Sequence, residues 1–138
     1  MQSAALRRVL APSRRRATLD APPVAMSDAS AMTPRDRDVL AEFARGVRAV
    51  ISDARIWAFG SRARGTAGPD ADLDICVVIP AINPAVRESV YHAAWEVGFN
   101  QPDCMVLSPI LLTRESFENG PMAASALVAN ILREGVAA

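Results

Sequence analysis

The chain has 138 residues, the length of one ordinary domain, and its 51% hydrophobic and 22% charged residues are typical of a globular protein rather than a disordered one. Its formal net charge is zero, which argues against a dedicated nucleic-acid surface, and no apolar run approaches the roughly 20 residues of a membrane span. All 15 basic residues are arginines, so chemistry that needs a lysine is excluded.

The first 32 residues are predicted to form a tail outside the folded domain. Residues 1–19 contain five arginines and no acid, and Pro22 and Pro23 then favour an extended linker. An arginine-rich, acid-poor start resembles a mitochondrial transit peptide. The alternatives are a disordered tail, or translation that really begins at Met26 or Met32. We therefore place the domain at residues 33–138.

Two long helices are predicted from the same start signal. Thr33 and Pro34 match an N-cap followed by proline at the first helical position, and Asn83 and Pro84 repeat this pattern. Apolar residues recur at helical spacing after each pair, while short runs rich in β-branched residues predict strands.

In chain order we expect a helix from 34 to near 52, a strand over 55–59, a short helix over 61–64, a strand over 73–79, a helix from 84 to near 98, a strand over 103–107, a helical turn over 113–119 and a helix over 122–134. This order predicts an α/β (α+β) fold, a small mixed sheet of about three strands flanked by helices.

The chain has two cysteines, Cys76 and Cys104, and both lie in runs that are predicted to be strands. Two cysteines form neither a disulfide framework nor a zinc site. We expect reduced, buried thiols on neighbouring strands, which is consistent with a cytoplasmic protein.

Asp72 and Asp74 open the predicted strand over 73–79. Side chains two residues apart on a strand point to the same face, so the two carboxylates are expected a few ångströms apart. Two like charges at that distance are unfavourable unless a cation lies between them, and Mg²⁺ prefers carboxylate oxygens. The alternative is a pair of solvated acids at the start of a strand.

Gly60 and Ser61 directly follow the predicted strand over 55–59. A glycine at this place permits an unusual turn and a close approach of the backbone, and the N–H groups that follow can bind phosphate at the start of a helix. The absence of lysine excludes a P-loop. A phosphate-binding turn beside a carboxylate pair indicates a site for a metal-bound nucleoside triphosphate.

The spacing of these residues resembles the nucleotidyltransferases of the DNA polymerase β superfamily: a Gly-Ser pair, then ten residues, then Asp-x-Asp. The run Gly-Ser-Arg-Ala-Arg-Gly over 60–65 and the small size resemble the minimal nucleotidyltransferase (MNT) branch. These proteins are commonly the antitoxin partners of HEPN-domain ribonucleases. The resemblance covers about Thr33 to Val136. Two departures are Ala71, where the family often has serine, and the first 30 residues, which match nothing in the family.

The resemblance implies a polymerase-β-like fold and a site with two Mg²⁺ ions and ATP or another nucleoside triphosphate. Asp72 and Asp74 would ligate Mg²⁺. The family has a third carboxylate on a following strand, and Asp103 is the acid in a matching place. It would ligate the second ion and help to deprotonate the acceptor.

The same resemblance assigns the phosphate contacts. Gly60 and Ser61 would hold the β- and γ-phosphates. Arg62 and Arg64 could neutralise phosphate charge, because the arginine fork matches phosphate oxygens. The alternative for each arginine is a solvated side chain in a polar loop.

The implied activity is Mg²⁺-dependent transfer of a nucleoside monophosphate, AMP from ATP, to an acceptor hydroxyl on a HEPN-type toxin partner or an RNA end. The alternative is a non-catalytic antitoxin that masks a toxin by contact. Retention of Gly60, Ser61 and three carboxylates favours the enzyme. A contact surface for the partner is expected on the helix from 34 to near 52 or on the C-terminal helix, unless these helices simply pack on the sheet. A small-molecule resistance adenylyltransferase is less favoured because 138 residues leave no second domain.

Overall fold

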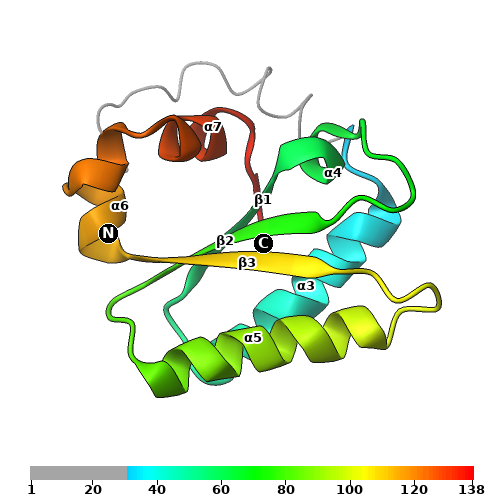
Figure 1. Cartoon of the computed structure of the whole chain (residues 1–138), viewed down its shortest axis with the longest axis horizontal. Helices are drawn as coiled ribbons and strands as arrows, with labels where there is room; N and C mark the ends of the chain where they lie inside the picture. The colour runs from blue at the N-terminus through cyan, green and yellow to red at the C-terminus, as the bar shows by residue number, and fades with distance from the viewer. Residues whose placement is uncertain (1–30) are drawn as a thin grey trace.

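The computed structural model describes residues 31–138, so the predictions for residues 1–30 lie outside the described part (Figure 1). Its elements in chain order are α3 (Pro34–Arg48), β1 (Arg55–Phe59), α4 (Gly60–Arg64), β2 (Leu73–Ile79), α5 (Pro84–Phe99), β3 (Leu107–Thr113), α6 (Arg114–Glu118), the 3-10 helix η1 (Pro121–Ala124), α7 (Ala126–Glu134) and β4 (Val136–Ala137). Within residues 31–138, no helix has both the length and the apolar character needed to cross a bilayer.

The strands form one mixed sheet in the order β3-β2-β1-β4. Strand β1 is antiparallel to both β2 and β4, while β2 is parallel to β3. The parallel pair is joined by the crossover helix α5. The predicted fold class is therefore confirmed, with one more strand than expected. Strand β4 has only two residues, which is too short to produce a recognisable alternating pattern.

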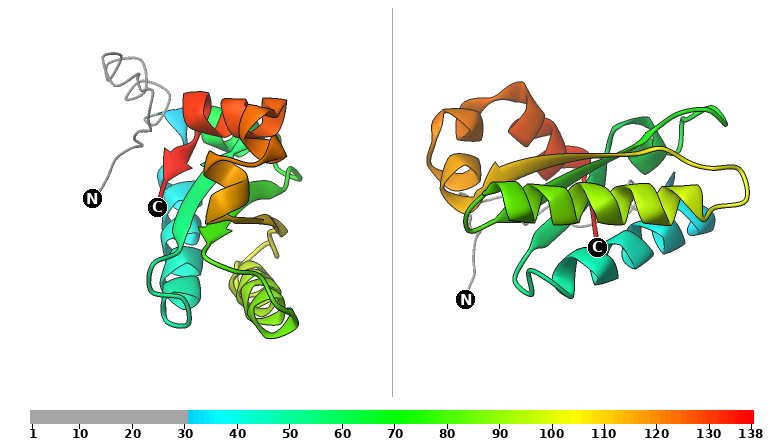
Figure 2. Two further views of the ribbon diagram at one scale, coloured as in Figure 1. Left: turned by 90° about the vertical axis from the view of Figure 1, so that its left-hand side faces the viewer. Right: turned by 60° about the horizontal axis from the view of Figure 1, so that its bottom comes forward.

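Helices cover both faces of the sheet (Figure 2). Helices α3 and α5 pack on the face that contains Leu73, Ile75 and Val77. The opposite face contains Cys76 and Val78, and it packs against α6 and α7. Strand β2 lies between two cores, which explains why its sequence is an almost continuous apolar run after Asp74.

Both long helices begin where the capping signals predict. The Thr33 hydroxyl accepts a hydrogen bond from the Asp36 N–H at 3.1 Å, and the Asn83 side-chain oxygen accepts one from the Val86 N–H at 2.8 Å. Each of these helices has proline in its first turn. Met32 is also buried, with 2% of its surface exposed, so the packed part of the chain begins at least one residue before the predicted boundary.

The predicted strand over 103–107 is wrong, because β3 begins only at Leu107. The connection from α5 turns sharply instead, and Cys104 adopts a positive φ of 55°. A side chain at Gly98 would place its Cβ only 2.2 Å from the Met105 carbonyl oxygen, so this connection packs directly against the end of α5. As a result Cys104 is exposed, contrary to expectation, whereas Cys76 is buried as predicted.

The predicted C-terminal helix is divided in two. Ser125 lies between η1 and α7, where its hydroxyl donates to the Met122 carbonyl at 2.7 Å and accepts from the Val128 N–H at 3.2 Å. Val128 and Ile131 are buried on the sheet, while Leu132 is 64% exposed. Most of the apolar face of α7 therefore packs within the domain.

Candidate functional site

The start of β2 lies directly beside the start of α4. Phe59, the last residue of β1, pairs with Asp74 across the antiparallel ladder, and Gly60 follows it with a positive φ of 81°. A Cβ atom at Gly60 would lie 2.6 Å from Oδ2 of Asp74. The position therefore requires glycine twice, for its backbone conformation and for the space that the carboxylate occupies.

Three polar side chains gather on this part of the sheet. Asp74 pairs in register with Ser108 on the parallel strand β3, so the two side chains share a face. The Ser108 hydroxyl donates a hydrogen bond to Oδ2 of Asp72 at 3.1 Å. The structure thus brings Asp72 and Asp74 together as predicted. Ser108 was missed, because its place follows only from the register of β3.

The negative charge of the carboxylate pair is only partly compensated. Partial burial raises the pKa of Asp74 above its ordinary value, and the negative charge of Asp72 raises it further, while the cation of Arg64 acts in the opposite direction. A carboxylate whose charged form is penalised in this way gains from a nearby cation. Two carboxylates from adjacent positions suit one hard divalent ion such as Mg²⁺, which takes its remaining ligands from water and phosphate.

Arg62 has a different role from the predicted phosphate contact. Its guanidinium is buried and forms an ion pair with Asp36 of α3, with Nη1 at 3.0 and 3.1 Å from the two carboxylate oxygens. The same group donates from Nε to the Ala71 carbonyl at 2.8 Å and from Nη2 to the Pro69 carbonyl at 3.2 Å. Arg62 therefore holds the segment that leads into Asp72, and its fork is directed into the protein.

Arg64 remains close to the carboxylate pair. It is about half exposed and lies near enough to Asp74 to lower the pKa of that carboxyl. Its Nη1 also donates to Glu134 of α7 at 3.3 Å. Ser61, the other predicted phosphate ligand, lies in the first turn of α4, where its carbonyl accepts from the Thr66 N–H at 2.9 Å. Their phosphate contacts remain predictions.

Asp103 does not join the carboxylate pair. It lies in the turn after α5, where both of its oxygens accept hydrogen bonds from the Arg35 guanidinium. That ion pair holds the pKa of Asp103 below its usual range. Across residues 31–138, no three His, Cys, Asp or Glu side chains gather closely enough to form a metal centre. Asp103 was expected to be the third carboxylate of the site, but the group that contacts Asp72 is the neutral hydroxyl of Ser108.

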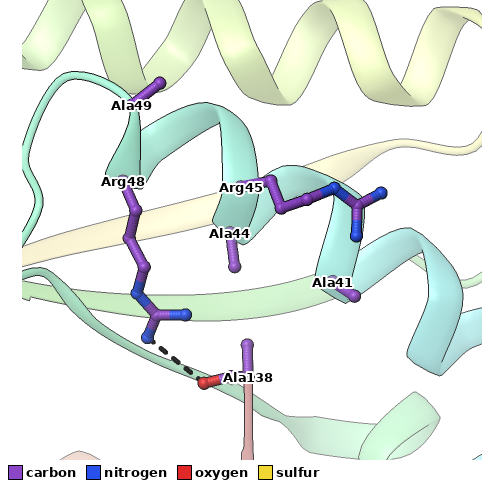
Figure 3. A pocket seen from close by; sticks show the side chains of 6 residues that line it. All are labelled: Ala41, Ala44, Arg45, Arg48, Ala49 and Ala138. Carbon is purple, nitrogen blue, oxygen red and sulfur yellow. Dashed lines mark hydrogen bonds between the residues drawn. The ribbon is translucent and has the colours of Figure 1, made fainter.

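A large hollow lies apart from these residues. A groove of about 540 Å³ lies between α3 and Ala138, the residue that follows β4. Arg48 donates to the Ala138 carbonyl there at 3.2 Å, and Figure 3 shows the residues that line the groove. Its lining is mostly alanine, with Arg45 as the other charged group. None of the carboxylates described above lines it, so the groove is separate from the candidate site.

Two comparisons with known proteins bear on this site. A search of curated proteins finds no match for the chain. The family model described as a nucleotidyltransferase domain matches residues 40–137. This match includes the turn at Gly60, both carboxylates and Ser108, and it extends through all four strands of the sheet. The chain therefore belongs to the nucleotidyltransferase domain family.

Proposed function

We propose that this domain transfers AMP from ATP to a hydroxyl group on a protein partner, in a reaction that depends on Mg²⁺ and takes place in the cytoplasm. The observation that carries the proposal is the contact between the turn at Gly60 and the carboxylate of Asp74. It places a backbone turn at a glycine directly against a pair of acids whose charge is only partly compensated. The family match supports nucleotidyl transfer in general.

Each residue of the site has a proposed task. Asp72 and Asp74 would hold Mg²⁺, which when bound supplies positive charge to the triphosphate and its pyrophosphate leaving group. Gly60 leaves room for the phosphates to approach the backbone, and Ser61 offers a hydroxyl and an N–H in the first turn of α4. Arg64 is a half-exposed cation whose charge acts on Asp74, and it could contact a phosphate oxygen.

The proposed partner is a HEPN-type ribonuclease. A protein partner fits the exposed apolar surface of α5, where Trp95 and Phe99 stack with ring centroids 4.9 Å apart and are 64% and 59% exposed. Large exposed aromatic side chains of this kind often mark contact surfaces. The predicted contact through α7 is less well supported, because Val128 and Ile131 are buried within the domain, although Leu132 is exposed.

A second candidate is an antitoxin that inhibits its partner by contact alone. One observation favours it: Asp103 pairs with Arg35 and leaves the site with two carboxylates rather than three. A site that has lost a metal ligand can retain nucleotide binding without transfer. The two candidates predict different products, so one experiment separates them.

The test incubates the protein with Mg²⁺, ATP and the product of the adjacent gene, followed by intact mass spectrometry of both chains. An added AMP mass on the partner, absent with Asp74→Asn, supports the enzyme. Asp70→Asn, which removes an exposed acid of the preceding loop, is the matched control and should retain transfer. Inhibition of the partner without a mass change, and equally strong with Asp74→Asn, would establish the contact antitoxin instead.

A further inference from the structure

The hydroxyl of Ser108 lies beside the two carboxylates of the site. Register places Ser108 beside Asp74, and its Oγ donates to Oδ2 of Asp72 at 3.1 Å. A group on β3 at this position reaches the same space as both acids. Any ligand that approaches Asp72 and Asp74 therefore contacts a neutral hydroxyl instead of the negative charge of a third carboxylate.

Neither Asp36 nor Asp103 supplies the negative charge that Ser108 lacks. Asp36 is occupied by Arg62 inside the domain, and Asp103 is occupied by Arg35 on the surface. Arg64, which also donates to Glu134 of α7, adds positive charge next to Asp74. The site itself therefore supplies two negative charges, reduced by one neighbouring cation.

Two divalent ions need more than this site offers. In paired metal sites the ions lie about 3.5–4 Å apart, and their mutual repulsion must be offset by shared anionic ligands. Asp72 also uses one oxygen to accept the Ser108 hydrogen bond, which leaves fewer lone pairs for a bridging role. The triphosphate can complete the shell of one ion, but the second ion would lack a carboxylate on the β3 side.

We propose that the site holds one divalent cation together with a nucleoside triphosphate, and that Ser108 is the residue that sets this number. The inference rests on the proposed function, because it assumes that the carboxylates receive a metal-bound nucleotide. It makes a specific statement about this chain: a negative charge at position 108 creates the second ion site, whereas a neutral side chain of the same size does not.

The experiment counts Mn²⁺ ions bound to the full chain in the presence of one equivalent of α,β-methylene ATP. Electron paramagnetic resonance measures free Mn²⁺, and water-proton relaxation distinguishes an ion held in the protein–nucleotide complex from one held by nucleotide alone. The variants are Ser108→Asp, its matched neutral control Ser108→Asn, and Asp103→Asn. Thermal melting of each variant confirms that it is folded.

The expected stoichiometry is one ion per complex for the unmodified protein, Ser108→Asn and Asp103→Asn, and two ions for Ser108→Asp. Two ions in the unmodified protein would overturn the inference, as would a single ion in a folded Ser108→Asp variant. If Ser108→Asp does not fold, the inference is judged from the numbers of Mn²⁺ ions bound by the unmodified protein and by Ser108→Asn. A relaxation signal equal to that of nucleotide alone, and unchanged by Asp74→Asn, would overturn the proposed function together with this inference.

Discussion

Two acidic side chains lie next to residues of helix α4, and their charges are compensated to different degrees. Inside the domain, Asp36 is 3% exposed and is neutralised by the buried guanidinium of Arg62. At the first residue of the same helix, Asp74 lies against Gly60 next to Asp72, and its pKa is raised because burial and the neighbouring charge penalise ionisation. The acid paired with a buried arginine contributes to the fold, whereas the charge of Asp74 is only partly offset by the half-exposed Arg64.

The buried pair should have the largest effect on stability. Asp36→Ala would leave the Arg62 guanidinium buried without its counter-charge, and breaking such a pair typically costs about 3–5 kcal/mol. Urea denaturation at pH 7 measures this loss as a lower transition midpoint. In the double variant Asp36→Ala/Arg62→Ala the total loss should be smaller than the sum of the single losses, because each single change removes the same interaction. A loss below about 1 kcal/mol for Asp36→Ala would place this pair with ordinary surface ion pairs.

Gly60→Ala tests the close approach between the first residue of α4 and Asp74. A residue other than glycine at positive φ costs about 1–2 kcal/mol, and the new methyl group would displace the Asp74 carboxylate from its place. We expect a lower melting temperature and the loss of Mn²⁺–nucleotide binding in the relaxation assay.

Gly68→Ala is the matched control for that change. A Cβ atom at Gly68 meets nothing within 4 Å, and its φ is not in the positive range. The control should therefore retain both stability and binding. Unchanged nucleotide binding in Gly60→Ala would show that the close contact with Asp74 is not needed by the site.

Asp74→Asn should have a smaller effect on stability, and in the opposite direction to Asp36→Ala. Because the pKa of Asp74 is raised in the folded state, the folded protein binds more protons than the unfolded one between the ordinary pKa and the raised value. The free energy of unfolding therefore falls as pH rises through that window. Asp74→Asn removes this dependence, so it should melt at the same or a higher temperature at pH 7. A clear loss of stability at pH 7 would show that the charged form of Asp74 is stabilised by the fold.

Asp103→Asn should have the smallest effect. Both partners of the Arg35 pair are about half exposed, so salt and side-chain entropy offset most of its attraction. The lowered pKa of Asp103 means that any contribution is present at neutral pH and disappears on acidification through the lowered value. Melting curves at low and high salt should nearly coincide with those of the unmodified protein. Loss of nucleotide binding in this variant would restore Asp103 to the site.

The sequence predicts the parts of this molecule whose signals are local. The caps at Thr33 and Asn83, the β-branched run after Asp74 and the glycine at the end of β1 each depend on a few neighbouring residues, and the structure agrees with each. Asp72 and Asp74 were found for the same reason, because their spacing of two residues at the start of a strand predicts a shared face without any knowledge of the rest of the sheet.

The missed features depend on distant residues or on register. Nothing near Arg62 indicates that its partner is Asp36, because α3 and α4 meet only after folding. The strand that contains Ser108 also contains Pro109, which weakens a strand pattern, yet β3 lies at the edge of the sheet, where proline is tolerated. Because β3 begins at Leu107, Ser108 rather than Asp103 lies beside Asp72.

Strand β4 has a consequence for the order in which the domain assembles. It pairs Val136 with Ala58 and Ala137 with Trp57, so it joins the outer edge of β1 to the far end of the domain's sequence. Closing so long a loop is entropically costly and tends to come late in folding. Until it closes, β1 presents an unpaired edge that can recruit another chain. In pulse-labelling hydrogen exchange during refolding, the β1–β2 amides should become protected before those of β4. Aggregation during refolding is then expected from molecules in which β1 has paired with β2 but not yet with β4.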